Sequence, residues 1–188
     1  MSQTDLAHAT DGLSIGVDAP LNESAKWNIS LRVDKYADDA AYARGEIYET
    51  VITDGNLVTT AGWGRITTLL NAGTGNLIAS TTVRVGAGNS NTAASVGQTD
   101  LQAAAGSSNR WFQTSTVTVP SSPVIQAVAV FGTADGNFAW EEWCLDVGTA
   151  TVSSGNTVNA VMLNRKVASN GTKASGQTWT ATATITFS

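Results

Sequence analysis

Three carboxylates in one apolar stretch come closest to catalytic chemistry in this sequence: Glu141, Glu142 and Asp146. Two carboxylates that face one cleft can hydrolyse a glycosidic bond as acid and base. Consecutive residues of a strand point to opposite faces, so Glu141 and Glu142 do not form such a pair. A buried Glu142 needs a cationic partner, and Arg165 is the candidate. We interpret the group as a structural ion pair, with a glycan hydrolase as the enzymatic alternative.

Histidine and cysteine chemistry is nearly absent from the sequence. The chain has one histidine, His8, and one cysteine, Cys144, which excludes multi-histidine and multi-cysteine metal sites. His8 precedes the first patterned segment, and Cys144 lies in an apolar run where we expect a buried, inert thiol. The Gly86-Ala87-Gly88 motif lacks the third glycine of a dinucleotide-binding loop, so we interpret it as a turn. No catalytic residue, cofactor or metal is expected.

Charge and composition exclude further classes of function. Only 13% of the 188 residues are charged, roughly half the usual share. The net charge is −5 and the ten basic residues are scattered, so nucleic acid is not an expected partner. The sequence has no run of eighteen apolar residues, which a membrane-spanning helix would need. The N-terminus lacks the basic region of a secretory signal. Neutral Thr, Ser, Gly and Asn surfaces are typical of β-proteins that pack in assemblies or lie outside cells.

Hydrophobic alternation with a period of two predicts a mainly β fold. Strands are predicted at residues 26–33, 47–52, 80–85, 110–119, 124–131, 138–147, 157–167 and 177–187. Segment 124–131 is apolar on both faces, which favours a central strand with 138–147 as its neighbour. The spacing of the strand signals predicts an antiparallel β-sandwich or barrel.

Helical signals are few. Asp38 and Gly45 can begin and end a short helix, and residues 56–71 form the best helical stripe. A helical turn is also expected near Asp100, within residues 92–105. The fold class is therefore mainly β with one or two short helices. Residues 1–24 are predicted to form an extended N-terminal arm, and residues 25–188 a single β-rich domain.

Six tryptophans are many for a chain of this size, and three explanations compete for them. They fill one core, anchor subunit contacts, or stack on sugars. Most lie in phase with apolar neighbours, so core filling is the default. Trp63 stands between Gly62 and Gly64, which let another backbone approach the helix closely.

Several short motifs occur in order along the chain. They are DGNLV at 54–58, VRVGAG at 83–88, QTDLQ at 98–102, NFAWEEW at 137–143, LNRK at 163–166 and GTKASGQTWT at 171–180. This series resembles a group of structural virion proteins of tailed bacteriophages, found in heads and tails. The resemblance covers about residues 46–188.

The resemblance implies a virion protein without catalytic residues. The implied member type is a capsid decoration (cement) protein that binds the outside of an assembled shell and stabilises it. Its partners are then the major capsid protein and further copies of itself, as a homotrimer, and its location is the capsid surface after synthesis in the host cytoplasm. The alternative is a tail or head fibre module that binds a host-surface glycan or receptor.

The N-terminal arm is expected to become ordered only on the shell or on a neighbouring subunit, which lets a short segment cover a large area. The predicted partner-contact residues are Leu13, Ile15 and Val17 in the arm, and Trp27, Tyr36 and Tyr42 at the start of the body.

Overall fold

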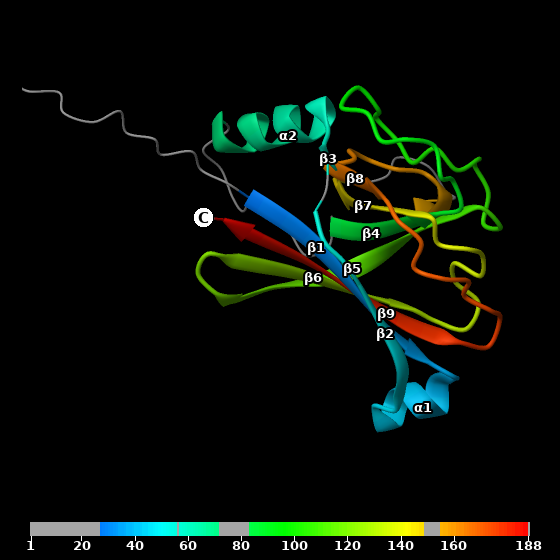
Figure 1. Cartoon of the computed structure of the whole chain (residues 1–188). Helices are drawn as coiled ribbons and strands as arrows, with labels where there is room; N and C mark the ends of the chain where they lie inside the picture. Colours follow the sequence, from blue (N-terminus) through cyan, green and yellow to red (C-terminus); the bar gives the residue numbers. More distant parts are fainter. Residues whose placement is uncertain (1–26, 56, 72–82, 149–154, 188) are drawn as a thin grey trace, which may run out of the picture.

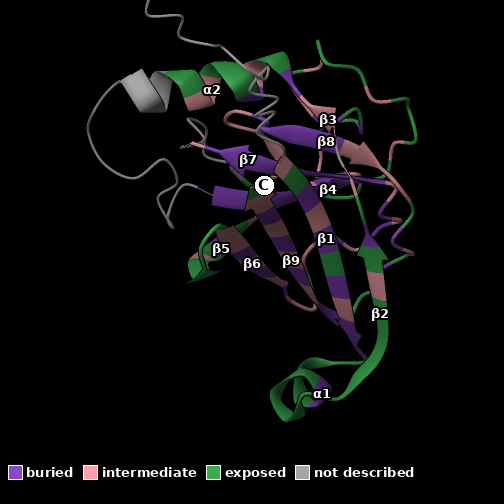
Figure 2. Ribbon diagram, turned by 60° about the vertical axis from the view of Figure 1, so that its left-hand side comes forward, coloured by how far each residue is buried: buried purple, intermediate pink, exposed green. Residues whose placement is uncertain are grey.

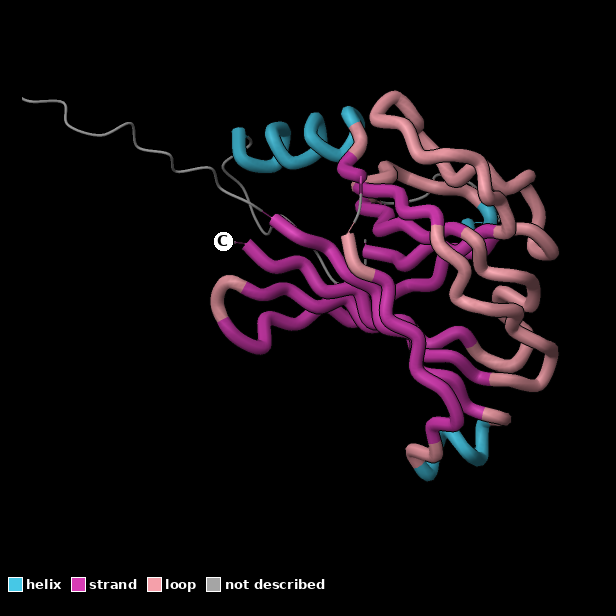
Figure 3. Tube along the Cα trace, viewed as in Figure 1, coloured by secondary structure: helices cyan, strands magenta, loops and turns pink. Residues whose placement is uncertain are grey.

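The computed structural model describes residues 27–55, 57–71, 83–148 and 155–187, so the predicted arm lies outside the described residues. In chain order, the elements are β1 (Trp27–Tyr36), α1 (Asp39–Arg44), β2 (Ile47–Thr53), β3 (Leu57–Val58), α2 (Thr60–Asn71), β4 (Val83–Gly88), β5 (Arg110–Ser121), β6 (Val124–Phe131), β7 (Glu142–Val147), the 3₁₀ turn η1 (Gly155–Thr157), β8 (Asn164–Val167) and β9 (Thr178–Phe187). The prediction of a mainly β, antiparallel fold with few helices is confirmed (Figures 1 and 3).

The nine strands form one curled antiparallel sheet in the order β2-β1-β9-β6-β5-β4-β7-β8-β3. Strand β5 is the turning point of this sheet. Its first half, residues 110–114, pairs with β4, and its second half, residues 115–121, pairs with β6. The two parts of the sheet therefore fold toward each other, and the described edge strands β2 and β3 are consecutive in the chain (Figure 1).

One apolar core fills the space between the two parts of the sheet (Figure 2). From one side, β1, β9 and β6 contribute Leu31, Ala183 and Ala129, and from the other side, β4 and β7 contribute Val85 and Leu145. These residues alternate with polar neighbours along β1 and β9, as the period-two pattern predicts. Burial of this inner face fixes the register, because a slip by one residue would turn every apolar side chain to solvent.

Helix α1 forms where its capping residues predict it. Asp38 is the N-cap, and its carboxylate accepts a hydrogen bond from Ala41 N at 2.7 Å. Gly45 ends the helix with φ 71°, in the left-handed region that glycine adopts without strain. The Asp39 carboxylate accepts a hydrogen bond from the Thr178 hydroxyl, which ties the helix to β9.

Helix α2 begins at Thr60, because residues 57–58, predicted as its first turn, pair instead with β8 as strand β3. The predicted close approach is confirmed at Gly62, where an added Cβ would lie 2.1 Å from the backbone oxygen of Leu163. Gly64 has nothing within 4 Å of such a Cβ, so the prediction is wrong there. Gly62 thus sets the α2 backbone against the residue before β8.

The interpretation of Gly86-Ala87-Gly88 as a turn is wrong, since these residues form the buried second half of β4. A Cβ on Gly86 would lie 2.7 Å from both Cys144 Sγ and the Phe112 ring, and one on Gly88 would lie 2.5 Å from Glu142 Oε1. The glycines therefore serve packing, because they leave room for large side chains of β5 and β7 to cross the strand.

Two further expectations fail for reasons of tertiary pairing. Segment 138–147 is regular only over β7, which pairs with β4 and β8 and not with β6. The neighbours of β6 are β5 and β9, so the prediction that β6 is central holds. Residues 92–105 contain turns and bends but no helix, since their backbone is held by side chains from the sheet.

The packing role of Gly86 predicts a stability defect. Gly86→Ala should lower the free energy of unfolding by about 1–3 kcal/mol, because the added methyl overpacks the contact with Phe112 and Cys144. Gly64→Ala is the matched control and should leave stability unchanged or raise it by up to about 1 kcal/mol, as alanine favours helix. Urea unfolding measures both, and equal stability of the two variants would contradict the packing role.

Candidate functional site

A layer of buried charges covers the outer face of β4, β7 and β8. The antiparallel register places Arg84 directly opposite Asp146, and Gly88 opposite Glu142. Glu142, Asp146 and Arg165 are all 0% exposed. The predicted pair is confirmed, since Arg165 Nε lies 2.6 Å from Glu142 Oε2.

The Glu142–Arg165 pair binds the backbone of the long β4–β5 connection. Glu142 accepts hydrogen bonds from Gln102 N at 3.1 Å and Ala103 N at 2.7 Å. Arg165 donates to Gln98 Oε1 at 3.0 Å and to the backbone oxygen of Thr92 at 2.8 Å. One ion pair therefore holds both halves of this connection against the sheet.

Two further ion pairs extend the layer. Arg84 Nε donates to Asp146 Oδ2 at 2.9 Å, while Asp146 Oδ1 accepts from Ala160 N at 2.8 Å. At the other end, Arg110 Nη1 lies 2.8 Å from Asp100 Oδ2, and Arg110 Nε donates to the Thr157 backbone oxygen at 2.7 Å. The layer thus also binds the segment between β7 and β8.

The carboxylates of this layer bind groups of the protein itself. Both oxygens of Glu142 and both oxygens of Asp146 are occupied by donors from the protein. Burial raises the pKa of Asp146 against the opposing effect of Arg84, and burial raises the pKa of the Cys144 thiol, which keeps it protonated. Within the described ranges, no group of three His, Cys, Asp or Glu side chains could hold a metal ion.

Lys173 is a second kind of buried charge. It is 1% exposed, and its Nζ donates to the Gly132 backbone oxygen at 2.8 Å and to Asn137 Oδ1 at 2.7 Å. These acceptors are neutral, so burial lowers the pKa of Lys173 to about 8, against the charges of Asp135 and Asp39. Lys173 links the loop before β9 to the loop after β6.

An exposed group of aromatic side chains lies where β1 begins and β9 ends. Trp27 stacks on Phe187 with ring centroids 5.9 Å apart, and Trp63 of α2 lies 5.2 Å from Trp27. Trp63 is 50% exposed and Phe187 is 42% exposed. We call Trp27, Trp63 and Phe187 the aromatic patch.

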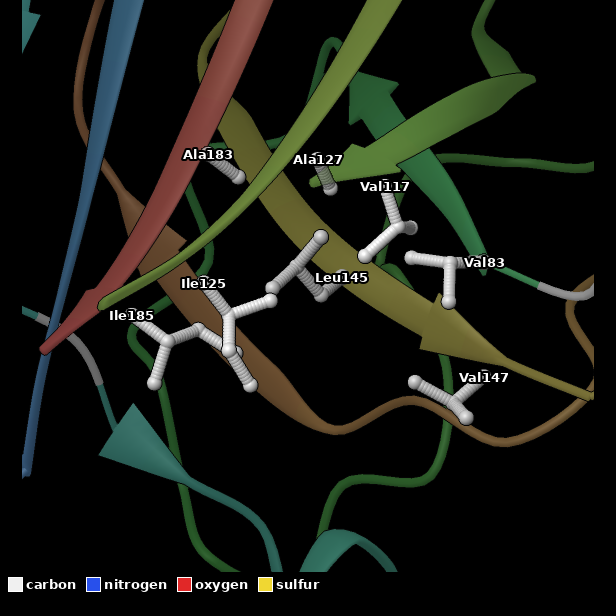
Figure 4. A pocket seen from close by; sticks show the side chains of 8 residues that line it. All are labelled: Val83, Val117, Ile125, Ala127, Leu145, Val147, Ala183 and Ile185. Atoms are coloured by element: carbon white, nitrogen blue, oxygen red, sulfur yellow. The ribbon is translucent and has the colours of Figure 1, made fainter. Parts of the chain in front are cut away.

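A small apolar hollow lies in the core near the end of β9 that carries Phe187. The space between its side chains is too small to hold a water molecule. It is lined by Val83, Val117, Ile125, Ala127, Leu145, Val147, Ala183 and Ile185 (Figure 4). Ile185 connects the two features, because it lines the hollow and lies two residues before Phe187 on β9. Only the aromatic patch exposes apolar surface here, because most of the side chains that line the hollow are buried.

The three predicted partner-contact residues that the structure describes, Trp27, Tyr36 and Tyr42, do not form one surface. Leu13, Ile15 and Val17 lie outside the described residues. Trp27 belongs to the aromatic patch, whereas Tyr36 lies at the opposite end of β1 and is only 8% exposed. Its ring is covered by Tyr42, which packs edge-on at 5.1 Å and is itself 39% exposed. These two ends of β1 are about 30 Å apart.

Sequence reasoning missed two members of the patch. Core filling is the default expectation for Trp63. In the structure, Gly62 packs against Leu163, and the adjacent Trp63 side chain faces solvent. Phe187 continues the unbroken alternation of β9 past the end of the core. The signal that could have found it is its place opposite Trp27, at the open end of the strand pair.

No helix among the described residues is long and apolar enough to cross a membrane. Comparison with family models, with curated proteins and with solved structures found no match to this chain.

The buried Lys173 predicts a pH-dependent stability. Because its pKa is about 8 in the folded protein and about 10.5 when unfolded, the unfolded chain retains the proton longer, and stability rises between these pH values. In Lys173→Met this contribution disappears. The stability of the wild type relative to the variant should therefore increase by roughly 2 kcal/mol between pH 7.5 and pH 10.

Urea unfolding of both proteins at the two pH values measures this difference. The two lost hydrogen bonds of Lys173→Met lower stability equally at both pH values, so they cancel. A difference between the proteins that does not change with pH would show that Lys173 titrates normally.

Proposed function

We propose that this protein is a non-enzymatic virion component of a tailed bacteriophage, which binds the outside of the assembled capsid as a decoration protein and contacts the shell with its aromatic patch. The carrying observation is the exposure of Trp63 and Phe187 around Trp27. A few residues supply most of the binding energy in protein interfaces, and tryptophan is enriched among them. Shell stabilisation then follows from contact area, with no reaction required.

The position of the patch in the chain supports this proposal. Trp27 is the first described residue, so the predicted N-terminal arm is joined to the chain next to the aromatic patch. Leu13, Ile15 and Val17 can then contact the same partner as Trp63. A segment that gains order on binding adds area, and several such contacts in a homotrimer add avidity.

The resemblance to phage virion proteins bears on the framework more than on the patch. Its motifs contain Arg84, Asp100, Glu142, Arg165 and Lys173, which are the charges that hold the loops. Trp27, Trp63 and Phe187 fall outside the motifs. The motif residues would then form a scaffold that the virion proteins share, while the contact surface differs from one protein to the next.

A fibre module that binds a host-surface glycan is the second candidate. It is favoured by one observation, the half-exposed Trp63 ring beside Trp27, because sugars stack on exposed indole rings. This function predicts saturable binding of a purified surface polysaccharide, lost in Trp63→Ala, and no affinity for capsid shells.

Shell binding by patch variants tests the proposal. We expect the double variant Trp63→Ala, Phe187→Ala to bind assembled shells that lack this protein at least about tenfold more weakly than wild type, as judged by co-sedimentation. Both side chains are partly exposed, so the variant should fold, which far-UV circular dichroism checks.

A chain without residues 1–24 should also remain folded and bind shells poorly.

Tyr42→Ala is the control variant. Tyr42 is also predicted from the sequence as a contact residue, but it lies outside the aromatic patch, near the other end of β1, and has similar exposure. It should bind shells as wild type does. Equal loss in the control and the patch variant would remove the patch from the contact. Wild-type protein that does not sediment with shells would contradict the proposed function itself.

A further inference from the structure

Strand β2 is an open edge of the sheet. It is the terminal strand in the sheet order, and in the described part of the chain it pairs with β1 and with no second strand. Figure 2 shows it at the rim, with exposed residues along most of its length. Such an edge carries a row of backbone N–H and C=O groups that can pair with another chain.

The usual protections of an edge strand are weak in β2. Its seven residues contain neither proline nor lysine. Glu49 is its one charged residue, and that charge is paired with Lys35 at a distance of 3.1 Å. The bulge near Tyr36 interrupts only the first residues of β2, and the register is regular from Glu49 to Thr53. Tyr48 and Ile52 are 51% and 62% exposed.

The other described edge does not offer an equivalent surface. Strand β3 has two residues and leads into α2 after one more residue. A head-to-tail contact between a β2 edge and a β3 edge would therefore be too short to hold. Edge pairing between copies of this chain has to join β2 to β2, which is a two-fold contact that closes as a dimer.

The residues of β2 are complementary to themselves in one antiparallel register. Thr50 is the middle residue of the strand, and a two-fold axis at Thr50 pairs Glu49, Thr50 and Val51 in the regular part of β2. The same axis brings Tyr48, at the bulge, beside Ile52 of the second copy, and aromatic and β-branched side chains stabilise each other when they meet across strands. Glu49 lies opposite Val51, so no like charges meet.

We propose that β2 is a self-association site, through which two copies of this chain pair antiparallel about a two-fold axis at Thr50 and join their sheets. This contact is separate from the aromatic patch, which lies on β1, β9 and α2. It is also separate from a three-fold contact: where a trimer forms, the β2 pair joins two trimers.

Cysteine cross-linking of the full chain tests the register. In Thr50→Cys, the new thiol of one chain lies opposite the same thiol of the second chain across the axis. The two Cβ atoms are then about 4.5–5.5 Å apart, which is close enough for a disulfide after small adjustments. In Ile52→Cys, the two thiols are four positions apart, about 13 Å, and out of reach. Mild oxidation should therefore give a covalent dimer of Thr50→Cys and none of Ile52→Cys or wild type, whose Cys144 is buried. Equal cross-linking of the two variants, or none, overturns the proposal.

Charge repulsion gives an independent test in solution. Thr50→Lys places two ammonium groups opposite each other on the axis, and it should weaken the association at least about tenfold in analytical ultracentrifugation. Val119→Lys adds the same charge at a position that is 66% exposed on β5, and it should associate as wild type does. An assembly that Thr50→Lys leaves intact overturns the proposal, as does a wild-type protein that shows no association at high concentration.

Discussion

The ion pair between Glu142 and Arg165 is the interaction on which the outer half of the structure depends. Both side chains are fully buried, and removal of one partner from such a pair typically costs about 3–5 kcal/mol. The pair satisfies two backbone N–H groups and one backbone carbonyl of the β4–β5 connection. Together with the burial of Leu101 against Phe112, Cys144 and Met162, the pair gives this long connection a defined path over the sheet. Gly88 is the companion constraint, because only glycine leaves room for Glu142.

This use of charge further lowers the charge of a surface that the composition already makes weakly charged. The chain has 25 charged residues, the sum of ten basic and fifteen acidic ones, and seven of them are buried in the described structure. They are Lys35, Arg84, Arg110, Glu142, Asp146, Arg165 and Lys173. The sequence has few charged residues, and because seven of them are buried, the surface has fewer still. A weakly charged surface with exposed aromatics is suited to contact with other protein surfaces, which is the basis of the proposed role.

Local patterns predicted the elements whose environment is simple. Strands β1 and β9 follow their alternation because one face is buried along most of their length. Strand β6 is central, as its two apolar faces predict, and α1 follows its two caps. The Glu142–Arg165 pair was predictable because a carboxylate in an apolar strand requires a cation. The role of the glycines in β4 was not predictable, because glycine in a sequence usually indicates a turn. The packing role of Gly86 follows from Phe112 and Cys144, which only the fold brings beside it. Trp63 of the aromatic patch was missed because its exposure depends on how α2 packs against Leu163.

Hydrogen exchange at the Gln102 and Ala103 amides tests most directly whether the buried carboxylate holds the outer loop. Both amides donate to Glu142, so in the wild type they should exchange as slowly as the amides of β7. Glu142→Gln keeps the shape but replaces one acceptor oxygen with a donor. Exchange at both amides should then accelerate at least about tenfold, while β1 and β9 stay protected. Rapid exchange in the wild type, or rates that Glu142→Gln leaves unchanged, would contradict the account.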